Sequence, residues 1–216
     1  MKKLRTEVIF ILDRSGSMAG LENDTIGGFN SLLGKQKEEA GEVTVTTVLF
    51  DNEYELLHDR FDIHNVKPIT REQYFVRGST ALLDAIGRTI NKIANVQRNA
   101  GDSGKAEKVI FVIITDGMEN ASREYSYPMI KKMIELEKEK YGWEFIFLGA
   151  NIDADKTAGR YGIHKSRAMN YHADSQGLKN SYEKVNEAVR DVRGGSFNAV
   201  EWKKRAEKDF YDRKSK

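Results

Sequence analysis

The sequence contains no cysteine. Without thiols the chain has no disulfide bond, no thiolate metal site and no cysteine nucleophile, and such a composition fits a reducing compartment. Long apolar runs are also missing, since no stretch approaches the roughly 20 residues that cross a bilayer. The basic start of the chain leads into the run Val8 to Leu12, which is too short for a signal peptide and ends at Asp13. We therefore expect a cytoplasmic protein without a membrane segment.

Positive charge exceeds negative charge only slightly, and the formal net charge is +2 over 216 residues. This excess is concentrated in residues 202–216, which carry seven Lys or Arg and three Asp or Glu. A basic segment can contact nucleic acid, but charge-rich chain ends are more often solvated helix ends. We therefore expect residues 196–216 to form a basic C-terminal tail or helix, and we expect no nucleic-acid partner.

Four apolar runs rich in Val, Ile and Phe are nearly continuous rather than alternating, which is typical of strands buried on both faces of a parallel sheet. These runs are Val8–Leu12, Val43–Phe50, Val109–Thr115 and Phe145–Leu148. The more polar segment Tyr54–Phe61 follows Val43–Phe50 after a turn at Asp51 and Asn52. This short connection predicts a hairpin with an antiparallel edge strand.

Segments with helical spacing lie between and after these runs. They are Asn23–Glu39, Ala81–Val96, Pro128–Lys140, Asp153–Tyr161 and Ser175–Arg193. Alternation of strands and helices predicts a doubly wound, Rossmann-like open α/β sheet with helices on both faces. The sheet should be mostly parallel with one antiparallel edge strand. One such domain accounts for residues 1–195.

Oxygen-bearing side chains follow the first predicted strand, where Asp13, Ser15 and Ser17 occupy alternate positions. Alternate residues of an extended segment point the same way. Thr80 lies in a loop before a predicted helix, and Asp116 ends the most apolar strand. Open α/β sheets bind ligands beyond the carboxyl ends of their strands, which is where these segments lie.

These three hydroxyls and two carboxylates are hard oxygen donors, which suit magnesium or manganese better than zinc or copper. Each segment also has an ordinary interpretation. Asp and Ser after a strand are common turn or cap residues, a Thr before a helical run is a common N-cap, and Asp116-Gly117 is a common turn pair. Because all three segments lie at predicted strand ends or loop tips of one sheet, the combination favours a metal site.

The same residues resemble the metal-ion-dependent adhesion site (MIDAS) of von Willebrand factor type A (vWA) domains, which is written Asp-x-Ser-x-Ser, then Thr, then Asp. Asp13, Ser15, Ser17, Thr80 and Asp116 match all three parts in order. The resemblance covers residues 6 to about 170, with the helix to about 193 also plausible, and small stand-alone bacterial and phage members, including tellurium-resistance-type proteins, are the most similar. It implies direct metal ligation by the two serines and the threonine, with the aspartates orienting the site.

The resemblance implies a metal-dependent module that binds an acidic residue of a protein partner, with Glu119, Asn120 and the loop after Leu148 shaping specificity. A magnesium-dependent hydrolase of phosphate esters is an alternative. Such an enzyme surrounds the phosphate with Lys, Arg or a Gly-rich loop, and only Arg14 and Arg77 lie near these motifs. A metal-free scaffold that binds through the basic C-terminal segment is a third possibility. Partner identity and oligomeric state do not follow from the sequence.

Overall fold

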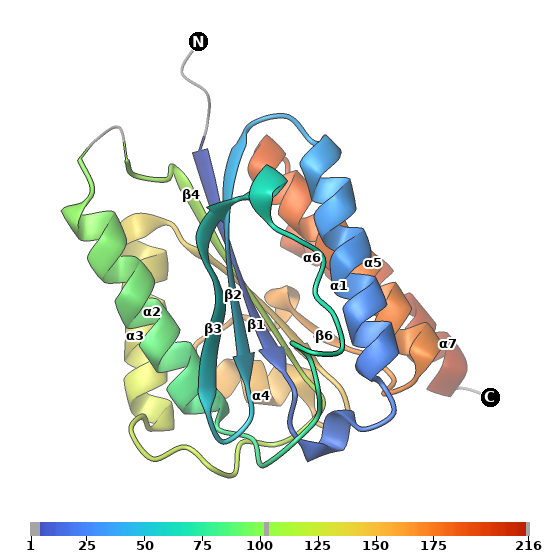
Figure 1. The fold of residues 1–216 in the computed structure, drawn as a ribbon. Coiled ribbons are helices and arrows are strands. Elements are labelled where there is room, and N and C mark those ends of the chain that lie inside the picture. Colours follow the sequence, from blue (N-terminus) through green and yellow to red (C-terminus); the bar gives the residue numbers. More distant parts are fainter. Residues whose placement is uncertain (1–4, 102–103, 215–216) are drawn as a thin grey trace.

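Strand β1 (Arg5–Asp13) lies at the centre of a six-stranded sheet of order β3-β2-β1-β4-β5-β6 in the computed structural model, which describes residues 5–101 and 104–214 (Figure 1). Its residues from Val8 to Leu12 are buried, as expected for a strand covered on both faces. The other strands are β2 (Glu42–Phe50), β3 (Tyr54–Asp62), β4 (Lys108–Thr115), β5 (Glu144–Gly149) and β6 (Ala168–Asn170).

Only β3 runs antiparallel, and it forms the sheet edge beside β2. The other neighbouring strands pair in parallel. The predicted fold class, including the antiparallel edge strand, is therefore confirmed. The short strand β6 at the opposite edge was not predicted, because three residues are too few to show a period.

Helices cover both faces of the sheet (Figure 1). One apolar core joins the sheet to α1 (Glu22–Glu38), α5 (Ser175–Gly194) and α6 (Ala199–Ala206). A second core joins the opposite face to α2 (Leu82–Asn99), α3 (Tyr127–Tyr141) and α4 (Ala154–Arg160). Within the described ranges, no helix combines the length and apolarity needed to cross a membrane.

The basic C-terminal segment contains α6 and α7 (Lys208–Lys214), and α6 packs against the sheet domain. The indole of Trp202 is fully buried and donates a hydrogen bond to the Lys184 carbonyl at 2.8 Å. The buried carboxylate of Glu207 accepts hydrogen bonds from the backbone and side-chain amides of Asn170 on β6. Residues near the C-terminus therefore hold the edge strand in place.

Candidate functional site

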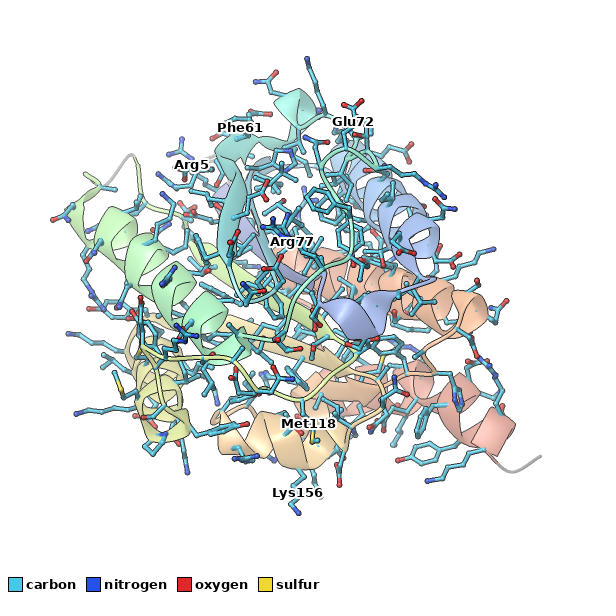
Figure 2. The ribbon with its side chains drawn as sticks, turned by 60° about the horizontal axis from the view of Figure 1, so that its bottom comes forward. Arg5, Phe61, Glu72, Arg77, Met118 and Lys156 are labelled. Atoms are coloured by element: carbon cyan, nitrogen blue, oxygen red, sulfur yellow. The ribbon has the colours of Figure 1, made fainter. Side chains whose placement is uncertain are left out.

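The five predicted site residues meet at the carboxyl ends of the parallel strands. The register of the sheet explains this convergence, because β1 and β4 are parallel neighbours in which Leu12 pairs with Ile114. The segments that follow, with Asp13 and Asp116, therefore leave the sheet at the same edge. Figure 2 brings this edge toward the viewer.

The hydroxyl groups form a continuous chain of hydrogen bonds to one carboxylate. Thr80 Oγ1 donates to Ser15 Oγ at 3.0 Å, and Ser15 Oγ lies 3.2 Å from Ser17 Oγ. Ser17 Oγ donates to Oδ1 of Asp116 at 2.5 Å. Side chains from three loops thus place their oxygen atoms together, and each hydroxyl retains lone pairs that a cation can use.

The carboxylate of Asp13 is bound on both oxygens by protein donors. Oδ1 accepts from the Ser15 backbone amide at 2.7 Å, and Oδ2 accepts from Thr115 Oγ1 at 2.5 Å. Burial raises the pKa of Asp13 to about 6, and the hydrogen bonds from Ser15 and Thr115 oppose that rise. In this arrangement Asp13 holds the Ser15 loop against the end of β4.

The second carboxylate, Asp116, has an oxygen without a protein partner. Its Oδ2 is buried and accepts no hydrogen bond from any residue that the structure describes, and burial raises the pKa of this carboxyl group. An unpaired buried carboxylate oxygen is costly, and a bound cation relieves that cost. No group of three or more Asp, Glu or His in the described ranges could hold a metal. A cation at Asp116 would therefore depend on hydroxyl donors.

Gly117 brings the backbone close to these donors. A Cβ atom at this position would lie 3.0 Å from Ser17 Oγ and 3.5 Å from Thr80 Oγ1. The hydroxyl cluster thus has no side chain from residue 117 against it. The donor set, the unpaired Oδ2 and this glycine fit a hard divalent cation such as magnesium or manganese.

The ordinary capping interpretation of these hydroxyls does not hold. Helix α2 begins at Leu82 with Ala81 at its cap, so Thr80 lies one residue too early, and no side chain at the cap position bonds to the helix. Glu119 takes over this role by accepting from the Leu83 amide at 2.8 Å. Ser15 precedes the 3-10 helix η1 (Gly16–Met18) and also makes no capping bond.

An ion-pair network around the buried Asp51 joins the serine loop to the threonine loop, and the sequence did not predict it. Oδ2 of Asp51 accepts from Arg14 Nε and Arg77 Nε, each at 2.8 Å. Burial alone would raise the pKa of Asp51, but hydrogen bonds from Arg77, the Glu53 backbone and Arg14 outweigh it, and the pKa is lowered. The Arg77 amide also donates to the Arg14 carbonyl at 2.9 Å. A carboxylate directly after a strand was the available signal, yet it was interpreted as part of a turn.

The loop after β4 is tied to the start of α2 by a second set of hydrogen bonds. Asn120 Oδ1 accepts from the Thr80 amide at 2.9 Å, and the Asn120 amide donates to the Thr80 carbonyl at 3.0 Å. Both carboxylate oxygens of Asp84 accept backbone amides of residues 123–125. The side chains of Glu119 and Asn120, predicted to shape specificity, therefore bond to neighbouring loops within the protein.

No family model and no curated protein matches the chain. Among solved structures, proximal thread matrix protein 1 from the mussel byssus matches at 13% identity and a TM-score of 0.60, over 87% of this chain and 47% of that one. A form of that protein described as having a zinc-occupied MIDAS motif matches at 13% identity and 0.56, over 87% and 46%. The ArnB paralog VWA2 from Sulfolobus acidocaldarius matches at 16% and 0.51, over 85% and 45%.

The chain therefore spans about half the length of these structures. Identities this low establish the fold alone. The mixed six-stranded sheet with helices on both faces is the fold of the vWA-type domains among them.

Proposed function

We propose that the protein is a metal-dependent binding module, in which Ser15, Ser17 and Thr80 hold a divalent cation directly while Asp13 and Asp116 orient the site. The observation that carries this proposal is the buried, unpaired Oδ2 of Asp116 at the end of the hydroxyl chain. Asp13 fits the orienting role because both of its oxygens already accept protein hydrogen bonds. Magnesium and manganese suit this oxygen-only donor set.

The partner that suits such a site is an acidic side chain of another protein. Hydroxyl ligands are neutral, so a shell built mainly from them leaves most of the double charge of the ion uncompensated. A carboxylate supplies both a hard oxygen and the missing charge. The vWA fold of the structural neighbours supports a binding role, and the similarity to stand-alone bacterial and phage members remains a prediction.

Hydrolysis of phosphate esters is less well supported, because the nearby arginines are already engaged. Arg14 is completely buried and pairs with Asp51 and Glu55, and Arg77 pairs with Asp51 and Glu53. A phosphate at the metal would need free cationic donors of this kind. Each guanidinium would have to leave its carboxylate to provide them.

Calorimetric titration with magnesium, manganese and zinc tests the metal site, with zinc included because the mussel protein carries it. We expect binding by the wild type and none by a variant that combines Asp13→Ala with Asp116→Ala. The control is Asp212→Ala, which removes an exposed carboxylate on α7. Equal affinity in the wild type and the double variant would rule out the site.

Partner binding is tested separately once a protein partner has been isolated. Its affinity should fall when magnesium is chelated. A partner variant with Asn or Gln in place of the interfacial Asp or Glu should bind weakly both with magnesium and with chelator. If the affinity is the same under both changes, the interface lies elsewhere on the domain.

A further inference from the structure

Two large apolar side chains are exposed on loops at the metal-site edge of the sheet. Met118 is 74% exposed in the loop after β4, and Phe75 is 43% exposed in the segment between β3 and α2. Isolated exposed apolar residues are ordinary and need no functional account. Met118 and Phe75 differ from such isolated residues because they lie in loops close to Asp116 and Asp13, and hydrogen bonds and ion pairs hold these loops in place.

Met118 lies two residues after Asp116, in a loop whose other polar groups bond to the protein. The preceding Gly117 amide donates to Thr115 Oγ1 at 3.3 Å. The following side chains, Glu119 and Asn120, accept backbone amides of the α2 start and the Thr80 loop. The side chain of Met118 is therefore exposed to solvent on a loop held by these bonds, and Figure 2 labels its position.

Phe75 lies in the segment that bonds to the loop after β1 through the Arg77 amide and the Arg14 carbonyl. Arg14 and Arg77 each place a guanidinium carbon 5.4 Å from its ring centre. Its ring lines a hollow of about 350 Å³ together with Glu22, Arg71, Tyr74 and Val76. The Tyr74 hydroxyl donates to the Asp13 carbonyl at 2.5 Å. This bond connects one wall residue of the hollow to the end of β1, where the proposed metal-site residues begin.

Charged side chains of both signs lie near this edge, so the metal itself has to select an acidic partner segment. Arg71 Nε donates a hydrogen bond to the side-chain oxygen of Asn23, and Arg71 forms no ion pair in the described part of the chain. Lys156, at the start of α4, likewise forms no ion pair among the described residues, and it extends outward from this helix in Figure 2. Glu72, next to Arg71, is exposed, and Glu22 lines the same hollow as Arg71. The nearby carboxylates of Glu53 and Glu55 are already paired with Arg77 and Arg14.

We infer that the partner presents a protein loop in which the metal-binding Asp or Glu is flanked on both sides by apolar residues. This inference rests on the proposed function. One apolar residue packs on Met118, and the other enters the hollow beside Phe75. The metal selects the charge, and the two apolar contacts select among acidic loops.

A random library of disulfide-closed peptides displayed on phage tests this inference, with selection in magnesium and elution by chelator. The enriched peptides should carry an acidic residue with apolar neighbours on both sides. The affinity of a selected synthetic peptide should fall about tenfold or more for Met118→Ser, because one buried apolar side chain loses its contact. The control is Leu136→Ser, which removes a 47% exposed apolar residue on α3.

Exchanging each apolar peptide residue for Ser assigns the contacts by double-mutant cycles. For the peptide residue that packs on Met118, the affinity losses of the peptide exchange and of Met118→Ser should not add. For the other apolar peptide residue, the two losses should add. Magnesium affinity should remain at the wild-type value in Met118→Ser.

Two results would overturn this inference and leave the proposed function intact. In the first, the chelator-sensitive peptides have no apolar residues beside their acidic residue. In the second, Met118→Ser does not change the affinity of the selected peptides. Failure to recover any chelator-sensitive peptide would overturn both.

Discussion

Replacing Gly117 with alanine separates metal binding from folding more cleanly than removing a ligand does. The new methyl carbon would lie 3.0 Å from Ser17 Oγ and 3.5 Å from Thr80 Oγ1. The first distance is shorter than ordinary van der Waals contact, so Ser17 must move by a few tenths of an ångström. Magnesium requires near-ideal octahedral geometry with ligands about 2.1 Å away, so a displacement of this size affects it directly.

We expect the magnesium affinity of Gly117→Ala to fall about 10- to 100-fold, the range typical of changes that disturb the support of metal ligands. Calcium binding should suffer less, because its coordination is more flexible. Stability should change by less than about 1 kcal/mol, because Gly117 has no left-handed backbone angle and alanine restricts the unfolded chain, while the displacement of Ser17 from Asp116 opposes that gain.

Calorimetry measures the affinities for both ions, and urea denaturation in chelator measures stability. Gly34→Ala in α1 is the matched control, because a methyl group there meets nothing within 4 Å. It should leave metal affinity unchanged. If Gly117→Ala binds magnesium as tightly as the wild type, the ion does not rest on Ser17 and Thr80, and the proposed ligand set is wrong.

Three other changes have defined outcomes. Since burial raises the pKa of Asp13 from 3.8 to about 6, metal-free stability should fall as pH rises from 4 to 6, and metal affinity should weaken about tenfold per pH unit below 6, by calorimetry between pH 5 and 7. Asp51→Asn should cost about 2 kcal/mol in urea denaturation, because Arg14, which is buried, and Arg77 lose the carboxylate that they share and only Glu55 still pairs with Arg14. Trp202→Ala should cost about 3 to 5 kcal/mol, whereas Val200→Ala, at an exposed position of α6, should cost little. If Asp51→Asn or Trp202→Ala is as stable as the wild type, the structural role assigned to that residue is wrong.

The sheet was predictable where burial leaves a pattern in the sequence. Near-continuous apolar runs located β1, β2, β4 and β5 to within a few residues, because strands covered on both faces admit few polar side chains. Strand β6 carries no such pattern in its three residues. It pairs with β5, and the Glu207 carboxylate binds Asn170 at its end. Contacts this distant in sequence leave no local signal.

The positions of the site oxygens were predictable, but their supports were not. The end of the strand placed Asp13, Ser15 and Ser17 close together, and Ser15 and Ser17 do meet. The prediction of alternate residues along an extended segment was wrong beyond Ser15, because Gly16–Met18 form a 3-10 helix that carries Ser17. The network beneath them joins Arg14 to Asp51 across 37 residues and Arg77 to Asp51 across 26. Arg14 lies between two site residues and is therefore expected to face away from them. The sequence around it does not indicate which carboxylate it contacts.

The carboxylates of Asp13 and Asp116 differ in their hydrogen bonding, and this difference affects how metal binding and partner binding depend on each other. Asp13 has no free oxygen, because Ser15 and Thr115 occupy both. Asp116 has one buried oxygen without a described partner. The site thus offers a dication mainly neutral hydroxyls and a single unshared carboxylate oxygen. Metal without partner then leaves charge uncompensated, and a partner carboxylate without metal meets only hydroxyls and the negative charge of Asp116. Under the proposed function, each ligand would therefore strengthen the binding of the other by the same factor, and the domain would act as a joint receptor for a cation and an acidic loop.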